Sequence, residues 1–136
     1  MYPAAPLTSS FQLRLVTQGG SVHVPAELSY DPADPFAVTA TFRSDEDAVA
    51  WTFSRDLLDE GLLAPAGEGD VAVWPCNDDN GEVICIALSS PFGQALLEAQ
   101  RHEVEAFIVR SFTSVPRGTE SDLIDIDAAI DHLLGR

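Results

Sequence analysis

The sequence lacks lysine altogether and carries few positive charges of any kind. Seven arginines stand against 22 aspartates and glutamates in 136 residues, which gives a formal net charge of −15. Nucleic-acid binding draws most of its affinity from cations that neutralise phosphates, and binding to anionic lipid needs such cations too. The composition therefore argues against a nucleic-acid partner and predicts a soluble chain that resists nonspecific association.

Long apolar runs are also absent. The longest, Val83 to Leu88, has six residues, whereas a helix needs about 20 to cross a bilayer. The first residues of the chain carry no positive charge and no long apolar stretch, so we expect no signal peptide. These observations predict a cytoplasmic protein with no direct membrane insertion.

Cysteine and histidine are too sparse to suggest a metal centre. Cys76 and Cys85 are the only cysteines, and His23, His102 and His132 fall on three separate segments. Two free thiols are typical of a reducing cytosol, although this pair could face each other across a hairpin and form a disulfide on oxidation. We predict neither a metal ion nor a cofactor.

Signatures of catalysis are missing as well. The glycines form no Walker A loop, no dinucleotide fingerprint and no Gly-x-Ser-x-Gly elbow. The acidic loop Asn77–Gly81 resembles a calcium loop only superficially, because an EF-hand alignment on its glycine puts Cys76 first and Ala87 twelfth, where acidic ligands are needed. A hairpin turn is the better interpretation. With no candidate catalytic residue, we predict that the chain is not an enzyme.

What the sequence does have is 46% apolar residues in short alternating runs, enough for one core. Residues 1–10 are predicted to be a flexible N-terminal tail, and residues 11–136 a single domain. Pro25 indicates an edge strand or a bulge, and Gly61 is placed to end a helix at C′. The first four strands are expected at 11–16, 22–30, 36–43 and 49–53, the last with Val49, Trp51 and Phe53 facing inward.

The second half of the chain mixes strands and helices. A short helix is expected at 55–60, followed by strands at 71–74 and 83–88, of which the second is apolar on both faces and therefore central. The segment Ala95–Ala99 fits either a strand or the first turn of a helix, and we favour a strand. Two helices complete the chain, one ending near Phe112 and one starting at Ser121 or Asp122. This order predicts an α+β fold with an antiparallel sheet of about seven strands.

Six residues are candidates for structural or interface roles. Asp34 and Pro35 are predicted to hold a turn, and Ser54 to cap the short helix. The aromatic residues Trp51, Phe53 and Trp74 are expected in the core or in a subunit interface. Stacking on bases, as in single-strand nucleic-acid-binding sheets, is the alternative that the scarcity of cations disfavours. No residue is assigned to a partner-binding site.

Five segments, taken in order, form a recognisable pattern: 24–31 with 33–38, 51–58, 67–71, 84–91 and 116–120. They resemble the SsgA-like (SALP) family of actinobacterial sporulation and cell-division proteins over nearly the whole chain beyond residue 10. The stretches 73–75 and 87–91 are most similar to the SsgB branch. The chain departs from that branch in its extended N-terminus, in Asn77–Asp79 and in Phe92.

The resemblance implies a fold similar to Whirly and mitochondrial guide-RNA-binding proteins, assembled as a bell-shaped homotrimer. It also implies a non-enzymatic protein that works at the cell septum during sporulation, together with other SsgA-like proteins. In the SsgB branch it implies recruitment of the tubulin-like protein FtsZ to future septum sites and promotion of its assembly. The alternative is a sister paralogue that acts in septum placement or wall remodelling without direct FtsZ binding.

Overall fold

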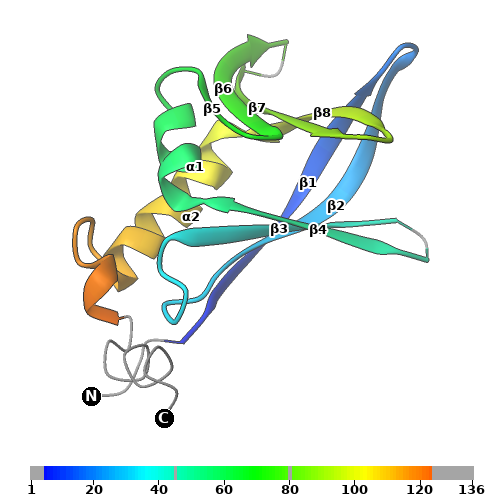
Figure 1. The fold of residues 1–136 in the computed structure, drawn as a ribbon. Coiled ribbons are helices and arrows are strands. Elements are labelled where there is room, and N and C mark those ends of the chain that lie inside the picture. Colours follow the sequence, from blue (N-terminus) through cyan, green and yellow to red (C-terminus); the bar gives the residue numbers. More distant parts are fainter. Residues whose placement is uncertain (1–4, 45, 80, 124–136) are drawn as a thin grey trace.

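A computed structural model describes residues 5–44, 46–79 and 81–123 of the chain, and within them eight strands and two α-helices. The order of elements is that of an α+β protein (Figure 1). The elements are β1 (Leu7–Thr17), β2 (Gly20–Tyr30), β3 (Ala37–Arg43), β4 (Ala48–Ser54), α1 (Arg55–Gly61), β5 (Ala66–Glu68), β6 (Val71–Asp78), β7 (Gly81–Ser90), β8 (Gly93–Gln100), α2 (Arg101–Ser114) and a 3-10 helix (Glu120–Leu123).

All eight strands form one antiparallel sheet in the order β4-β3-β2-β1-β8-β7-β6-β5. The middle of this sheet is weakly joined, because β1 and β8 pair only where Arg14 and Leu15 meet Glu98 and Leu97. The sheet therefore has two halves, β1–β4 and β5–β8, which diverge from this junction. Figure 1 shows both helices in the angle between the halves, while the hairpin ends of β3–β4 and β7–β8 point away from them.

The core lies where the inner faces of the two halves meet α2. Alternate residues of β1, β2 and β3 are buried, as the period-two pattern predicts, and they face apolar residues of β7 and β8. Strand β7 has Val83 and Cys85 buried on one face and Ile84 and Ile86 on the other, which confirms the predicted central strand. Helix α2 contributes three buried apolar side chains, Val104, Phe107 and Ile108.

Two expectations about single elements are confirmed, and one is not. The ambiguous segment Ala95–Ala99 lies within β8 and pairs with β7 from Leu88 to Ile84, so it is a strand. The edge strand or bulge expected at Pro25 is not found as such, because β2 lies between β1 and β3 and its register with β1 is unbroken; Pro25 lies one residue outside the stretch that pairs with β3. The helix expected to end near Phe112 is α2, which continues to Ser114.

One predicted boundary is wrong, and one strand was not predicted. The tail predicted for residues 1–10 is too long, because β1 starts at Leu7 and its polar residues 8–10 pair with residues 27–29 of β2. The sheet has eight strands rather than about seven, because β5, which has the composition of a loop, is held by pairing with β6. The final helix predicted from residue 121 lies largely outside the described residues. The structure describes only the 3-10 helix Glu120–Leu123 at its start.

The role predicted for Gly61 is also wrong. Gly61 is the last residue of α1 instead of a left-handed C′ residue, and Leu62 caps the helix with right-handed backbone angles. A Cβ atom at position 61 would lie 2.6 Å from the Cβ atom of Val73, and still closer to one of its methyl groups. Glycine is therefore needed because α1 approaches β6 closely, and no helix-ending conformation is involved.

Replacing Gly61 with alanine tests this close approach. Val73 is fully buried and cannot yield, so we expect Gly61→Ala to lower the free energy of unfolding by about 1–3 kcal/mol, although alanine has the higher helix propensity. Gly67→Ala is the matched control, because its nearest neighbour would lie 3.9 Å away, and it should change stability by less than about 0.5 kcal/mol. Urea denaturation measures both, and equal or higher stability of Gly61→Ala would contradict the packing described here.

Candidate protein-interaction surface

A buried arginine at the start of α1 holds the helices in place. The Arg55 side chain is 1% exposed. One terminal nitrogen donates to the carbonyl oxygens of Ser111 at 3.0 Å and Val115 at 2.9 Å, at the end of α2. The other donates to Glu120 Oε1 at 3.0 Å. Arg55 thus neutralises a half-buried carboxylate and supplies a donor to carbonyl oxygens at the end of α2, where Ser111 also accepts from the Val115 N–H.

Two aromatic rings complete the surroundings of this guanidinium. Its central carbon lies 4.0 Å from the ring centroid of Phe112 and 4.8 Å from that of Tyr30, both within cation–π range. Burial raises the pKa of the Tyr30 phenol, which keeps it protonated and able to donate to the Pro35 carbonyl at 2.9 Å. The Arg55 site therefore also anchors the turn that leads into β3.

The turn and cap residues predicted from the sequence lie around this site. Asp34 donates its backbone N–H to the Asp31 carbonyl at 2.8 Å, and Pro35 is fully buried. Ser54 accepts a hydrogen bond from the Leu57 N–H at 2.9 Å, so the predicted N-cap is present. By starting α1 at Arg55, this cap places the arginine next to the end of α2.

A substitution at Arg55 tests whether this buried charge holds the fold together. Arg55→Met removes the cation that pairs with the Glu120 carboxylate and a donor to the Ser111 and Val115 carbonyls, so we expect a loss of about 3–5 kcal/mol in the free energy of unfolding. Backbone donors stay at Ser111, from the Val115 N–H, and at Glu120, from the Gly118 N–H. Arg110→Met is the control, because Arg110 is exposed and, within the described part of the chain, donates a hydrogen bond only to Ser9; it should cost less than about 1 kcal/mol. Similar denaturation midpoints for the two variants would argue against a structural role for Arg55.

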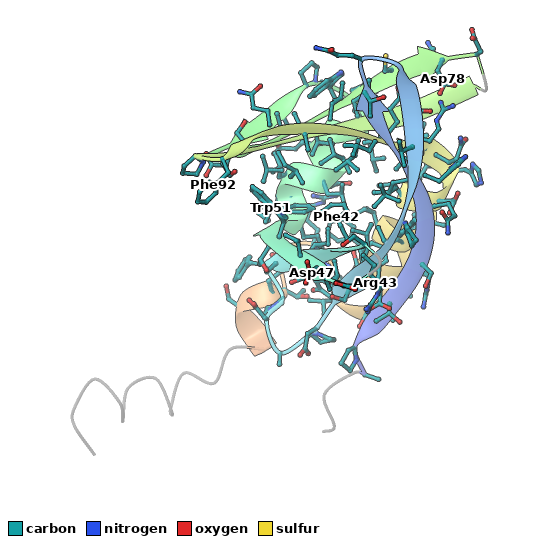
Figure 2. All side chains as sticks on the ribbon, turned by 90° about the vertical axis from the view of Figure 1, so that its right-hand side faces the viewer. Phe42, Arg43, Asp47, Trp51, Asp78 and Phe92 are labelled. Atoms are coloured by element: carbon teal, nitrogen blue, oxygen red, sulfur yellow. The ribbon has the colours of Figure 1, made fainter. Side chains whose placement is uncertain are left out.

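On the side away from the helices, an apolar groove opens between the two halves of the sheet. Trp51 of β4 lies on one side of it and the β7–β8 hairpin on the other, with Leu88, Phe92 and Ala95 among its lining residues. Figure 2 shows Phe92 at the end of the hairpin with Trp51 beside it, and Phe42, which packs against the core, beyond Trp51. Phe92 is 100% exposed at the hairpin turn, whereas Trp51 is half-buried against the core. This groove is called the Trp51–Phe92 groove below.

Among the described residues, strand β4 forms the edge of the sheet beside this groove. It pairs with β3 and is the outermost strand of that half. Residues 46–50 are all exposed, including Glu46 and Asp47 immediately before the strand. Val49, predicted to face inward, is 54% exposed, because the start of β4 extends beyond the packed body of the domain. That expectation was wrong.

The described residues offer little for chemistry. Within 5–44, 46–79 and 81–123, no three histidine, cysteine or acidic side chains gather as metal ligands would, and no helix is long and apolar enough to span a membrane. Cys76 and Cys85 are free thiols in diagonal positions on β6 and β7. Burial raises the pKa of Cys85 to about 12, which keeps it a protonated, weakly nucleophilic thiol.

The arginines are mostly engaged with acidic side chains. Arg14 contacts Asp78 and Glu98, and Arg55 contacts Glu120. Arg101 pairs with Glu82 and Glu105, and Arg117 with Asp56 and Asp59. Cations used in this way are not available to neutralise a phosphate backbone, so the structure gives no support to the nucleic-acid alternative.

Comparison with known proteins decides the family. The profile described as "Streptomyces sporulation and cell division protein, SsgA" matches residues 24–120. The chain belongs to the SsgA family. Among its relatives, the sporulation-specific cell division protein SsgB of Streptomyces coelicolor is 49% identical over 130 residues, covering 94% of this chain and 95% of the relative. SsgB of Frankia casuarinae is 48% identical over 130 residues, covering 94% and 91%.

Solved structures agree with the fold. One structure comes from work titled "Mutations in SsgB correlate to longitudinal cell division during sporulation of Streptomyces coelicolor". This structure superposes on the present chain with a TM-score of 0.86 at 48% sequence identity, and the match covers 91% of the present chain and 99% of the other chain. Another is an SsgA-like sporulation-specific cell division protein from Thermobifida fusca, with a TM-score of 0.87 at 40% identity and 98% coverage of both chains. The resemblance seen in the sequence, including that to the SsgB branch, is confirmed.

The SsgA-family match spans Arg55, all its partners and both sides of the Trp51–Phe92 groove.

Of the predicted aromatic residues, Phe53 is in the core at 8% exposure, Trp51 lines the groove, and Trp74 is half-buried opposite Cys85. No pattern in the sequence predicted a role for Arg55 or Phe92. A phenylalanine in a Pro-Phe-Gly hairpin turn is a signal for an exposed ring, whereas no local pattern marks Arg55.

Proposed function

We propose that this protein acts in sporulation-specific cell division as a non-enzymatic assembly factor that recruits FtsZ to future septum sites and promotes its polymerisation. Its SsgB relatives are named sporulation-specific cell division proteins, and they cover nearly the whole chain. The observation that carries the proposal is an exposed apolar groove beside a strand at the edge of the described sheet. Such a surface is suited to protein contacts.

The proposal includes a bell-shaped homotrimer that works in the cytoplasm at the septum with other SsgA-like proteins. A trimer would present three copies of each contact surface to a polymer with repeating subunits. Linked contacts of this kind raise avidity by about 10²–10⁴ over a single contact, which is how a weak binder promotes polymer assembly. Light scattering tests this part directly: a mass corresponding to one 14.6 kDa chain at all concentrations would rule the trimer out.

Co-sedimentation with purified FtsZ tests the recruitment. With GTP, we expect this protein in the pellet together with more FtsZ than FtsZ alone gives, and with GDP we expect it to stay in solution. The GDP sample is the control for trapping and aggregation. If FtsZ pellets normally while this protein remains in the supernatant, direct recruitment is wrong, and a sister role in septum placement or wall remodelling takes its place.

A further inference from the structure

We propose that the edge of β4 and the Trp51–Phe92 groove bind an extended, positively charged segment of a partner protein, which adds to the sheet as a further strand. The inference rests on the proposed function only in that the protein acts through protein contacts. It concerns the chemistry of the bound segment and holds whichever septal protein supplies that segment.

The edge of β4 has the properties of a strand-addition site. It pairs with β3 in unbroken register from Ala37↔Ser54 to Arg43↔Ala48, so no bulge twists the edge away. Its seven residues contain no proline and no charge, and it is the first strand in the sheet order. Proteins usually protect free edges with lysine, proline, bulges or a covering helix. Among the described residues none of these covers β4, which leaves its outward backbone groups open to a partner strand.

The groove supplies the side-chain contacts that an added strand needs. Along β4, Val49, Trp51 and Phe53 share one face and pass from 54% exposed to 8% exposed. A strand beside β4 would place its alternate side chains on this same face, above the groove between Trp51 and Phe92. Phe92 would then be covered instead of fully exposed. The segment should therefore carry apolar residues at alternate positions.

Charge determines what else the segment carries. Glu46 and Asp47 are exposed immediately before β4, and the chain as a whole has a net charge of −15. Arg43 lies at the end of β3, opposite Ala48, while Arg55 after the other end of β4 is buried. A second copy would bring a further net charge of −15 to this surface, and charges of the same sign oppose that contact. A segment with arginine or lysine at its ends is attracted instead, so we favour a cationic segment of another protein.

The test uses a synthetic peptide as long as β4, seven residues, with alternating valine and threonine and an arginine at each end. We expect it to bind the full-length protein in calorimetry and to slow amide hydrogen exchange in β4. Val49→Lys, which places a positive charge on the edge, and Phe92→Ser, which removes one side of the groove, should each weaken binding at least about tenfold. Leu63→Ser is the matched control, because Leu63 is 80% exposed outside the groove, and it should leave binding unchanged.

Three results would overturn the inference. The first is no binding of the arginine peptide, and the second is equal binding of a peptide with glutamate at its ends. The third is self-association of the protein that Val49→Lys and Phe92→Ser abolish, which would assign the surface to a second copy. Because the peptide assay contains no FtsZ, its failure leaves the proposed recruitment untouched, and a failure of FtsZ co-sedimentation leaves the peptide result standing.

Discussion

The buried guanidinium of Arg55 joins parts of the protein that the strand ladder does not join. The two halves of the sheet share backbone pairing only at Arg14 and Leu15, so other contacts must set the angle between them. Helix α2 begins directly after β8, in one half, and its end is bound by Arg55, which directly follows β4 in the other half. The helix therefore acts as a brace between the halves, with Arg55 as its attachment to the β1–β4 half.

The opening on the opposite side depends on the same brace. The Trp51–Phe92 groove has one side on β4 and the other on the β7–β8 hairpin, so its width follows the angle between the two halves. Apolar packing fills the closed side around α2, while Phe92 and Val49 stay exposed at the open side. The stability of the domain and its contact surface are thus linked through one angle, and a change at Arg55 should affect both.

Local patterns in the sequence predicted the elements that depend on local chemistry. The cap at Ser54 follows from capping chemistry, and the central strand β7 follows from a run that is apolar on both faces. The segment Ala95–Ala99 fitted a strand or a helix, and the favoured strand is present. Residues 7–10 and β5 were missed because their strand structure depends on a neighbouring strand. Arg55 was missed because its partners lie 56, 60 and 65 residues away. The family resemblance was confirmed, whereas FtsZ recruitment, the trimer and the likeness to Whirly proteins stay predictions.

The most direct test of a role in sporulation-specific division is complementation. This chain would be expressed in a Streptomyces coelicolor strain that lacks its own SsgB, its 49% identical relative, and sporulation septa would be counted by fluorescence microscopy with a membrane dye. The account predicts that septa form at regular spacing when the chain is present at the level of the native SsgB. An absence of septa at that level, with the protein shown to be folded and soluble in the hyphae, would contradict it.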